Sequence, residues 1–262
     1  MRTQIKLVGI VNVTPDSFSD GGKYIEAGAA IEHARNMIDQ GADIVELGAD
    51  STRPGSKCAG VEEEWSRLRD ILAAIAAFAT VGVDTHHPEV ARRAIAEGAL
   101  MINDVSAGAD RVMFDVVANS KAHIVLMHSR CSTPHNFDLA QNGDLIGCIG
   151  DYLDSRKMSA IASGIGPEKI ILDPGFGSFI SSSAVASFEL VRRFQELEML
   201  GSDLMIACSR KGFLKQDGEK QIEERDERSA QIATQIIGQL KNTQTVYIRA
   251  HNIMAYRGTA SY

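Results

Sequence analysis

The sequence predicts a single α/β domain over residues 1–262, folded as a (β/α)8 TIM barrel. Two patterns support this prediction: eight short apolar runs alternate with longer amphipathic stretches, and polar residues directly follow seven of the runs. Strands that are apolar along their whole length form parallel sheets that helices cover on both faces. Eight such units within about 250 residues favour closure of the sheet into a barrel.

The predicted elements follow one another in regular alternation. The strands are the apolar runs over residues 6–13, 44–49, 81–85, 100–105, 123–128, 169–174, 204–209 and 245–251. The helices are the amphipathic stretches over residues 27–40, 61–78, 88–97, 111–119, 145–163, 188–200 and 228–241. The highly charged segment 214–227 is predicted to be a mobile loop. Residues 252–262 leave room for about three helical turns after the last strand.

Composition is typical of a soluble globular protein. The chain is 44% hydrophobic and 23% charged, it contains no apolar stretch long enough to span a membrane, and its start does not resemble a signal peptide, so we expect a cytoplasmic protein. A net charge of −7 argues against general affinity for nucleic acid, which depends on many Lys and Arg contacts to phosphate. The four cysteines include no C-x-x-C pair, so neither a zinc site nor a disulfide framework is predicted.

Polar signatures at the ends of the predicted strands indicate an active site. In a parallel barrel all strand carboxyl ends open onto one face, where barrel enzymes place their chemistry. We therefore expect one bowl to collect the carboxylates, the amide and the cationic side chains that follow the strands, namely Asp84, Asn103, Asp173, Lys211, Arg249 and His251. Arg249 and His251 are separated by one residue, which places both on the same side of a strand and is typical of an anion clamp.

Each signature alone also has a plain structural explanation. Asp173-Pro174-Gly175 is a common strand stop and turn, and Ser209-Arg210-Lys211 is compatible with a solvated face. His128 is compatible with a core histidine that bonds a backbone carbonyl. The functional interpretation therefore depends on the joint pattern.

Seven motifs, in this order, resemble the dihydropteroate synthase family of pterin-binding barrels. They are Asn12-Val13-Thr14-Pro15-Asp16-Ser17-Phe18, Ser51-Thr52-Arg53-Pro54-Gly55, Asn103-Asp104, Leu126-Met127-His128, Asp173-Pro174-Gly175-Phe176-Gly177, Ser209-Arg210-Lys211 and Arg249-Ala250-His251. The resemblance implies a transferase of folate biosynthesis. Its expected reaction condenses 6-hydroxymethyl-7,8-dihydropterin diphosphate with p-aminobenzoate to give dihydropteroate and diphosphate.

The resemblance also implies roles for individual residues. The pterin would be bound by Asp173, Asp84, Asn103 and Lys211, with Met127 on its ring face and Phe176 among the substrate-binding residues. The diphosphate would be bound by Arg249 and His251, with Asn12 as a ligand of Mg²⁺. Asp16 would lie near the developing positive charge, and Thr52 and Arg53 would close the site over p-aminobenzoate. The family further implies a homodimer.

The chain departs from the family pattern at three places. Glu46 and Asp50 exchange the carboxylate lengths that the family usually has at these positions. The sequence Ser178-Phe179-Ile180 shifts an aromatic residue by one place and lacks the family's Lys, so we expect a reshaped arylamine pocket. Asn252 stands where the family often has Asp, and the tail is short, so the last helix is expected to pack differently.

Two other functions remain compatible with the sequence. A pterin-binding methyltransferase barrel would hold methyltetrahydrofolate with a similar Asn and Asp set, but it needs no diphosphate clamp such as Arg249 and His251. A paralogue that binds a pterin without catalysis is compatible with the changes at Glu46, Asp50 and Ser178. Turnover of p-aminobenzoate with the pterin diphosphate and Mg²⁺ separates the three functions.

Overall fold

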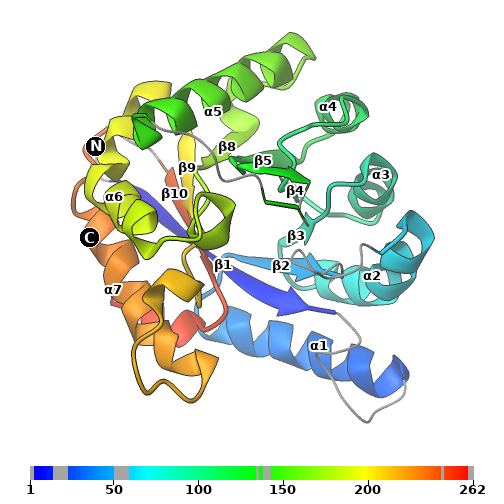
Figure 1. Ribbon diagram of the computed structural model, residues 1–262. Helices are drawn as coiled ribbons and strands as arrows, with labels where there is room; N and C mark the ends of the chain where they lie inside the picture. The colour runs from blue at the N-terminus through cyan, green and yellow to red at the C-terminus, as the bar shows by residue number, and fades with distance from the viewer. Residues whose placement is uncertain are drawn as a thin grey trace.

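The protein folds as a closed barrel of eight parallel strands surrounded by helices, as the sequence predicts (Figure 1). Going around the barrel, the strands are hydrogen-bonded in the order β1-β10-β9-β8-β5-β4-β3-β2. Because β1 pairs with both β2 and β10, the barrel has no open sheet edge. The computed structural model describes residues 3–13, 23–49, 59–133, 136–137, 143–242 and 245–258.

The strands and helices have the following bounds. The barrel strands are β1 (Gln4–Asn12), β2 (Ile44–Gly48), β3 (Val81–Asp84), β4 (Met101–Asp104), β5 (His123–Met127), β8 (Ile170–Asp173), β9 (Asp203–Ile206) and β10 (Thr245–Ala250). The described α-helices are α1 (Lys23–Asp39), α2 (Val61–Ala76), α3 (Pro88–Ala96), α4 (Val112–Ala118), α5 (Leu145–Ala162), α6 (Ala184–Arg193) and α7 (Asp226–Ile237). Short 3₁₀ helices are η2 (Pro167–Lys169), η3 (Gly177–Phe179), η4 (Phe194–Leu200), η5 (Gly212–Leu214), η6 (Ile222–Arg225) and η7 (Ile253–Tyr256).

The main differences from the predicted elements lie in the second half of the chain. A two-stranded antiparallel pair, β6 (Cys131–Thr133) and β7 (Asn136–Phe137), follows β5 and was not predicted. Helix α6 begins at residue 184, because the Ser183 side chain accepts a hydrogen bond from the backbone N–H of Val185. The described part of the tail holds one 3₁₀ turn, η7, where about three helical turns were expected.

The sequence predicts a mobile loop over residues 214–227, but hydrogen bonds and ion pairs hold this charged segment in the structure. It contains η6, and Glu219 accepts hydrogen bonds from both Arg225 and Arg228. The Gln221 and Glu224 side chains form a reciprocal capping box at the start of η6. These contacts tie the segment to α7.

Side chains inside the barrel form layers because successive residues of a strand point to opposite faces. The middle layer is an apolar cluster of Val8, Ile44, Met101, Val125, Ile171, Met205, Ala207 and Tyr247. Residues two positions further along these strands point in the same direction and lie one layer higher, among them Glu46, Asn103, Met127, Asp173 and Arg249. The polar residues therefore stand directly above an apolar floor.

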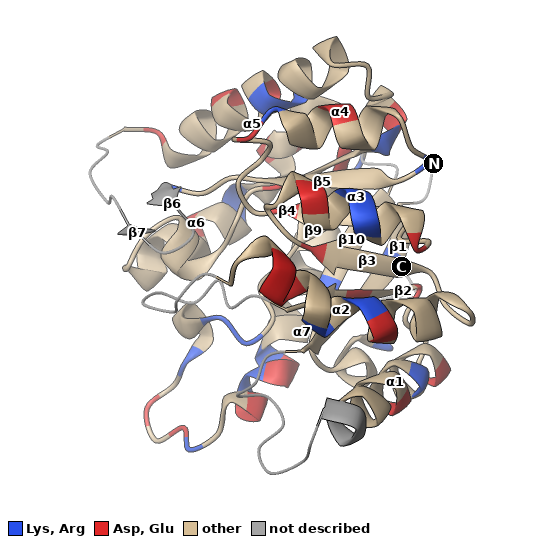
Figure 2. Ribbon diagram, turned by 90° about the vertical axis from the view of Figure 1, so that its right-hand side faces the viewer, with Lys and Arg blue, Asp and Glu red and all other residues tan. Residues whose placement is uncertain are grey.

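A second and larger apolar cluster fills the space between the strands and the helices. Helix α2, for example, buries Leu68, Leu72 and Ile75, and each fully buried side chain of this size stabilises the fold by about 1.5–3 kcal/mol. Lys, Arg, Asp and Glu residues are interspersed on the helices around this core (Figure 2). No helix of the described chain has the length and apolar character needed to cross a membrane.

Candidate active site

A pocket opens at the carboxyl ends of the barrel strands. Its lining joins strand-end residues from around the barrel with residues of the loops that follow, namely Asp84, Asn103, Val105, Met127, Asp173, Gly175, Phe176, Phe179, Ala207, Lys211 and Arg249. The pocket is narrow, with a cavity volume of about 30 Å³.

Asp173, at the end of β8, is held by the turn that follows it. Its Oδ1 atom accepts a hydrogen bond of 2.8 Å from the backbone N–H of Gly175. Gly175 has φ of +73°, and a Cβ there would lie 2.5 Å from the carbonyl oxygen of His128, so only glycine fits this turn. Burial raises the pKa of Asp173 to about 6, against the opposing effects of the Gly175 N–H and Lys211. Asp173 is therefore a buried carboxylate that is ionised near neutral pH.

Arg249 is tied to two carboxylates from neighbouring strands. Its Nε atom donates to Glu46 at 2.5 Å, and its Nη2 atom donates to Asp84 at 2.7 Å. Burial opposes the charge of Arg249, but Glu46 and Asp84 raise its pKa, so the guanidinium stays protonated. Burial likewise raises the pKa of Asp84, and Arg249 opposes that rise. Nη1 of Arg249 donates to no described residue, which leaves two N–H groups for an anion.

Glu46 also fixes the orientation of the Asn103 amide. The Nδ2 atom of Asn103 donates to Glu46 Oε2 at 3.1 Å. The Oδ1 atom of Asn103 is buried and has no hydrogen-bond partner among the described residues. Because an unpaired buried acceptor is costly, by about 1–3 kcal/mol, Asn103 is suited to receive a donor from a ligand.

Lys211 lines the same pocket as Asp84 and Asp173, and it lies against the aromatic ring of Phe179. Its Nζ atom is 4.3 Å from the ring centroid of Phe179, which packs in an apolar cluster with Val105 and Met127. Burial lowers the pKa of Lys211 to about 8, and Arg249 contributes to this shift while Asp173 opposes it. The pocket therefore combines the carboxylates of Asp84 and Asp173 with two cations, Lys211 and Arg249, and an apolar wall.

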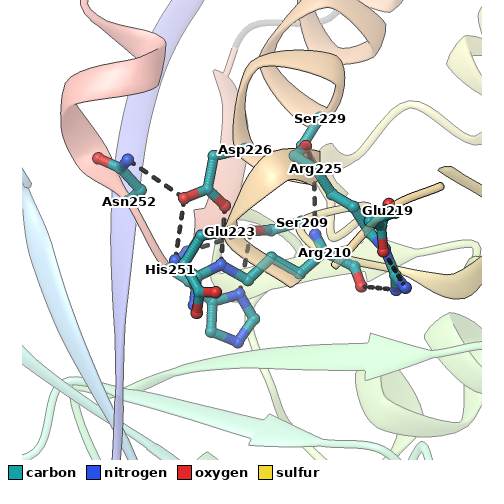
Figure 3. A network of polar contacts seen from close by, with 9 residues as sticks. All are labelled: Ser209, Arg210, Glu219, Glu223, Arg225, Asp226, Ser229, His251 and Asn252. Carbon is teal, nitrogen blue, oxygen red and sulfur yellow. Dashed lines mark hydrogen bonds and ion pairs between the residues drawn. The ribbon is translucent and has the colours of Figure 1, made fainter. Parts of the chain in front are cut away.

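His251 lies one residue beyond β10 and is neutral. Burial, together with the nearby cation of Arg249, lowers the pKa of His251 to about 3. Ser209 Oγ accepts a 3.2 Å hydrogen bond from the backbone N–H of His251 and lies 3.0 Å from its Nδ1 (Figure 3). We assign the tautomer in which the serine hydroxyl donates to Nδ1 and the ring proton lies on Nε2. His251 offers a neutral N–H donor, whereas the sequence analysis counted it among the cations.

The structure brings most of the predicted site residues together. Seven of them line the pocket, namely Asp84, Asn103, Met127, Asp173, Phe176, Lys211 and Arg249. The ring of Phe176 stacks on Phe194 and Phe213, so this residue belongs largely to the core behind the pocket.

The other predicted residues lie outside the pocket lining. Asn12 is exposed at the end of β1, at the rim of the barrel. His251 contacts Ser209 beside the pocket. Asp16, Thr52 and Arg53 lie outside the described residues.

Sequence reasoning missed two contributors to the site. Glu46 was noted only as a change in side-chain length, although a charged residue inside an apolar strand is a signal of an internal ion pair. Phe179 was noted as a shifted aromatic residue, but its position over Lys211 depends on the turn η3. The structure thus places Phe179 in the pocket wall.

Two polar residues next to the site have structural roles. His128 bonds the carbonyl of Pro174 through Nδ1 at 3.2 Å, as the plain explanation of this histidine predicts. Asp104 accepts hydrogen bonds from Ser106 and from the backbone N–H of Gly108, which shapes the loop after β4. Neither carboxylates nor histidines form a cluster of three suited to a metal ion within the described ranges.

Comparison with known proteins agrees with this geometry. The sequence profile of the family described as "Pterin binding enzyme" matches residues 8–242. Dihydropteroate synthase of Staphylococcus haemolyticus is 38% identical over 253 residues, which cover 96% of this chain and 91% of that protein. The type-3 dihydropteroate synthase of Escherichia coli is 36% identical over 212 residues, or 80% of this chain and 81% of that protein.

Solved structures of similar proteins contain relevant ligands. Xanthomonas albilineans dihydropteroate synthase with 4-aminobenzoic acid superposes with a TM-score of 0.88 at 32% identity, over 98% of this chain and 91% of that chain. The Anaplasma phagocytophilum enzyme with bound 6-hydroxymethylpterin-monophosphate has a TM-score of 0.85 at 34% identity, over 98% of this chain and 97% of that chain.

Proposed function

Because the chain belongs to the dihydropteroate synthase family of pterin-binding transferases, we propose that its barrel pocket joins p-aminobenzoate to 6-hydroxymethyl-7,8-dihydropterin diphosphate. One observation carries this assignment to a site. Asp84, Asn103, Asp173, Lys211 and Arg249 come from five different strand ends and line a single pocket. The products are dihydropteroate and diphosphate, an intermediate and a by-product of folate biosynthesis.

The acidic side of the pocket suits the edge of a pterin. A pterin presents adjacent N–H donors, and the Asp173 carboxylate and the free Oδ1 of Asn103 are acceptors on neighbouring walls. Lys211 supplies a donor for the acceptor atoms of the ring. Met127 offers an apolar contact for the ring face. Hydrogen bonds to charged partners contribute about 1.5–3 kcal/mol each, so two or three of them fix the ring's orientation.

The cationic side suits the leaving group. We propose that the diphosphate oxygens accept hydrogen bonds from Arg249 Nη1 and from Nε2–H of His251. As the exocyclic C–O bond breaks, its electron pair leaves with the diphosphate. The arylamine nitrogen then forms the C–N bond and releases one proton to solvent. These donors stabilise the departing charge, and no protein nucleophile takes part.

The residues present also fit a bound Mg²⁺. This ion prefers hard oxygen ligands and commonly takes only one or two from the protein, with the rest from substrate phosphates and water. Asn12 supplies one amide oxygen at the rim of the barrel, beside Gly48, which leaves space around it. When bound, Mg²⁺ would neutralise charge on the diphosphate oxygens. We expect activity to be lost on treatment with a chelator and restored by added Mg²⁺.

The loops after β1 and β2 complete the proposal. On the family resemblance, we assign Asp16 to the neighbourhood of the reacting carbon, and Thr52 and Arg53 to the p-aminobenzoate side. Phe179 adds an aromatic wall near Lys211, so we place the arylamine next to it. We further propose that the protein works in the cytoplasm as a homodimer.

The test is an assay for dihydropteroate and diphosphate with both substrates and Mg²⁺. We expect Lys211→Ala mainly to raise the KM for the pterin diphosphate, and Arg249→Ala mainly to impair diphosphate release, each by about 10-fold or more. Lys215→Ala is the matched control, because Lys215 is an exposed lysine of the same segment. Pterin binding without diphosphate release would identify a silent paralogue. Unaltered kinetics in either variant would contradict the role assigned to that residue.

A further inference from the structure

The turn that follows β9 contains a residue in an unusual backbone conformation. Arg210 has φ of +58°, a left-handed value that only one other non-glycine residue, Ala107, shares within the described ranges. The turn is closed by a hydrogen bond from the backbone N–H of Lys211 to the carbonyl of Cys208. A residue keeps such a conformation only where its surroundings hold it there.

The first turn of α7 and the residue before it hold Arg210 on three sides (Figure 3). Arg225 Nη1 donates to the backbone carbonyl of Arg210 at 2.9 Å. The backbone N–H of Arg210 donates to Ser229 Oγ at 3.1 Å. The guanidinium of Arg210 binds both oxygens of Asp226, through Nε at 2.7 Å and Nη2 at 2.9 Å. This two-point contact fixes the side chain as well as the backbone.

The residues on both sides of Arg210 belong to the proposed site. Ser209 holds His251 through the two hydrogen bonds described above, and Lys211 lines the pocket. A rotation of the turn at Arg210 therefore moves both side chains at once.

Asp226 also contacts the turn after β10, which carries His251. Asn252, which directly follows His251, donates from Nδ2 to Asp226 Oδ2 at 3.2 Å. Asp226 is only 5% exposed, so its charge is compensated mainly by these two partners. One buried carboxylate on α7 thus connects the turn after β9 with the turn after β10.

We propose that Asp226 is a positioning residue: by gripping Arg210 and Asn252 it sets Lys211 toward the pterin and His251 toward the diphosphate. It touches neither substrate, and it acts through the two turns. This inference rests on the function proposed above for the pocket. Other ion pairs of Arg210, such as the 3.2 Å contact with Glu223, are exposed and made by a single atom, so they do not set the turn.

The test compares Asp226→Asn with the double variant Asp226→Asn/Asn252→Asp. The double variant keeps the composition and exchanges the amide and the carboxylate at the two ends of the 3.2 Å contact between positions 226 and 252. We expect Asp226→Asn to lower kcat/KM for the pterin diphosphate by about 10- to 100-fold, and the double variant, which again has a carboxylate between the two turns, to recover part of this loss. Glu227→Gln is the matched control, because Glu227 is the exposed acidic neighbour in the same helix turn.

A second readout uses the ligand-free protein. We expect ¹⁵N NMR of the histidine rings to show the Nε2–H form of His251 in the native protein and the double variant. Asp226→Asn should give a mixture of tautomers, since Ser209 no longer holds Nδ1. If Asp226→Asn does not fold, Arg210→Lys replaces it, because lysine keeps the charge without the two-point contact.

The outcomes separate this inference from the proposed function. Native protein that forms no dihydropteroate would refute the function, while the NMR comparison would still test Asp226. A purely structural role predicts lower thermal stability with unchanged kinetics and an unchanged His251 tautomer, and this result would overturn the inference. Loss of activity that the double variant does not rescue would overturn it as well.

Discussion

At the scale of single residues, the pKa values of Asp173 and Lys211 are displaced toward each other. Burial raises the first from 3.8 to about 6 and lowers the second from 10.5 to about 8. Both groups are charged only in the interval between these values. Buried pairs of this kind at a strand-end pocket are typical of functional sites.

This pairing predicts a bell-shaped pH dependence for kcat/KM of the pterin diphosphate. Below about pH 6 Asp173 is protonated and loses acceptor capacity, so the rate should rise as the pH passes through that value. Above about pH 8 Lys211 loses its proton, so the rate should fall. Initial rates between pH 5 and about pH 9.5 measure both limbs. Lys211→Arg should shift the alkaline limb of the profile to higher pH, because arginine stays charged. A flat profile across this range would contradict the assignment.

Glu46 provides a second prediction at this scale. Glu46→Gln removes the charge that binds Arg249 and orients Asn103, so both side chains should lose their fixed positions. Since a charged hydrogen bond contributes about 1.5–3 kcal/mol, we expect kcat/KM to fall by about 10-fold or more. Glu46→Asp, which keeps the charge but shortens the reach, should lose less. Steady-state kinetics measure the effect, with exposed Glu32→Gln as the control. Equal kcat/KM values in Glu46→Gln and the native protein would refute this role.

Most of the pocket residues were predictable from the sequence, because the signal was local. Asp84, Asn103 and Asp173 each end an apolar run, and a parallel barrel gathers such ends on one face. The role of Glu46 was not predictable, since its partner Arg249 is 203 positions away in the chain. The neutral state of His251 also depends on tertiary surroundings that no local pattern records.

At the scale of elements, the turn after β8 leaves no room for a side chain at Gly175. It joins Asp173 to η3, and the backbone of β5 packs against it through the contact between Gly175 and the carbonyl of His128. The position of Phe179 over Lys211 follows from the same turn. Its geometry therefore sets both the acidic side and the apolar wall of the pocket.

Gly175→Ala tests this turn against a matched control. Gly218 also has a positive φ, of +82°, but nothing lies within 4 Å of a Cβ added there. We expect Gly218→Ala to lower the free energy of unfolding by about 1–2 kcal/mol, the cost of a left-handed non-glycine residue. Gly175→Ala should lose about 1–3 kcal/mol more, because its Cβ meets a backbone oxygen. Urea unfolding measures both. Equal losses would show that the contact with His128 is unimportant.

The order and type of the barrel elements were predictable, whereas their irregular parts were not. Periodic apolar patterns located the eight strands because strand burial is a local property of the sequence. The pair β6 and β7 is too short to give such a pattern. The conversion of the end of α6 into η4 and the ion pairs of Glu219 depend on packing and on partners elsewhere.

At the scale of the whole molecule, the proposed homodimer predicts the mass of the protein in solution. Val185 and Phe188 on α6 expose 68% and 40% of their surface, and their spacing of three residues places them on the same face of the helix. If α6 belongs to the interface, the native protein should have twice the 28.3 kDa mass of one chain in light scattering. Val185→Glu should shift this mass toward one chain. Met199→Glu, at an apolar residue that is 86% exposed on η4, should not. A native mass of one chain would exclude the dimer.

The apolar layer beneath the pocket has a consequence for the opposite end of the barrel. Lys6, His123 and Asp203 lie below this layer, where they interact electrostatically with one another. The apolar middle layer separates these charged groups from the pocket at the other end of the barrel. It includes Val8, Met101, Val125 and Met205. We therefore expect a label or tether attached at the lower rim to leave the formation of dihydropteroate at the upper end of the barrel unchanged.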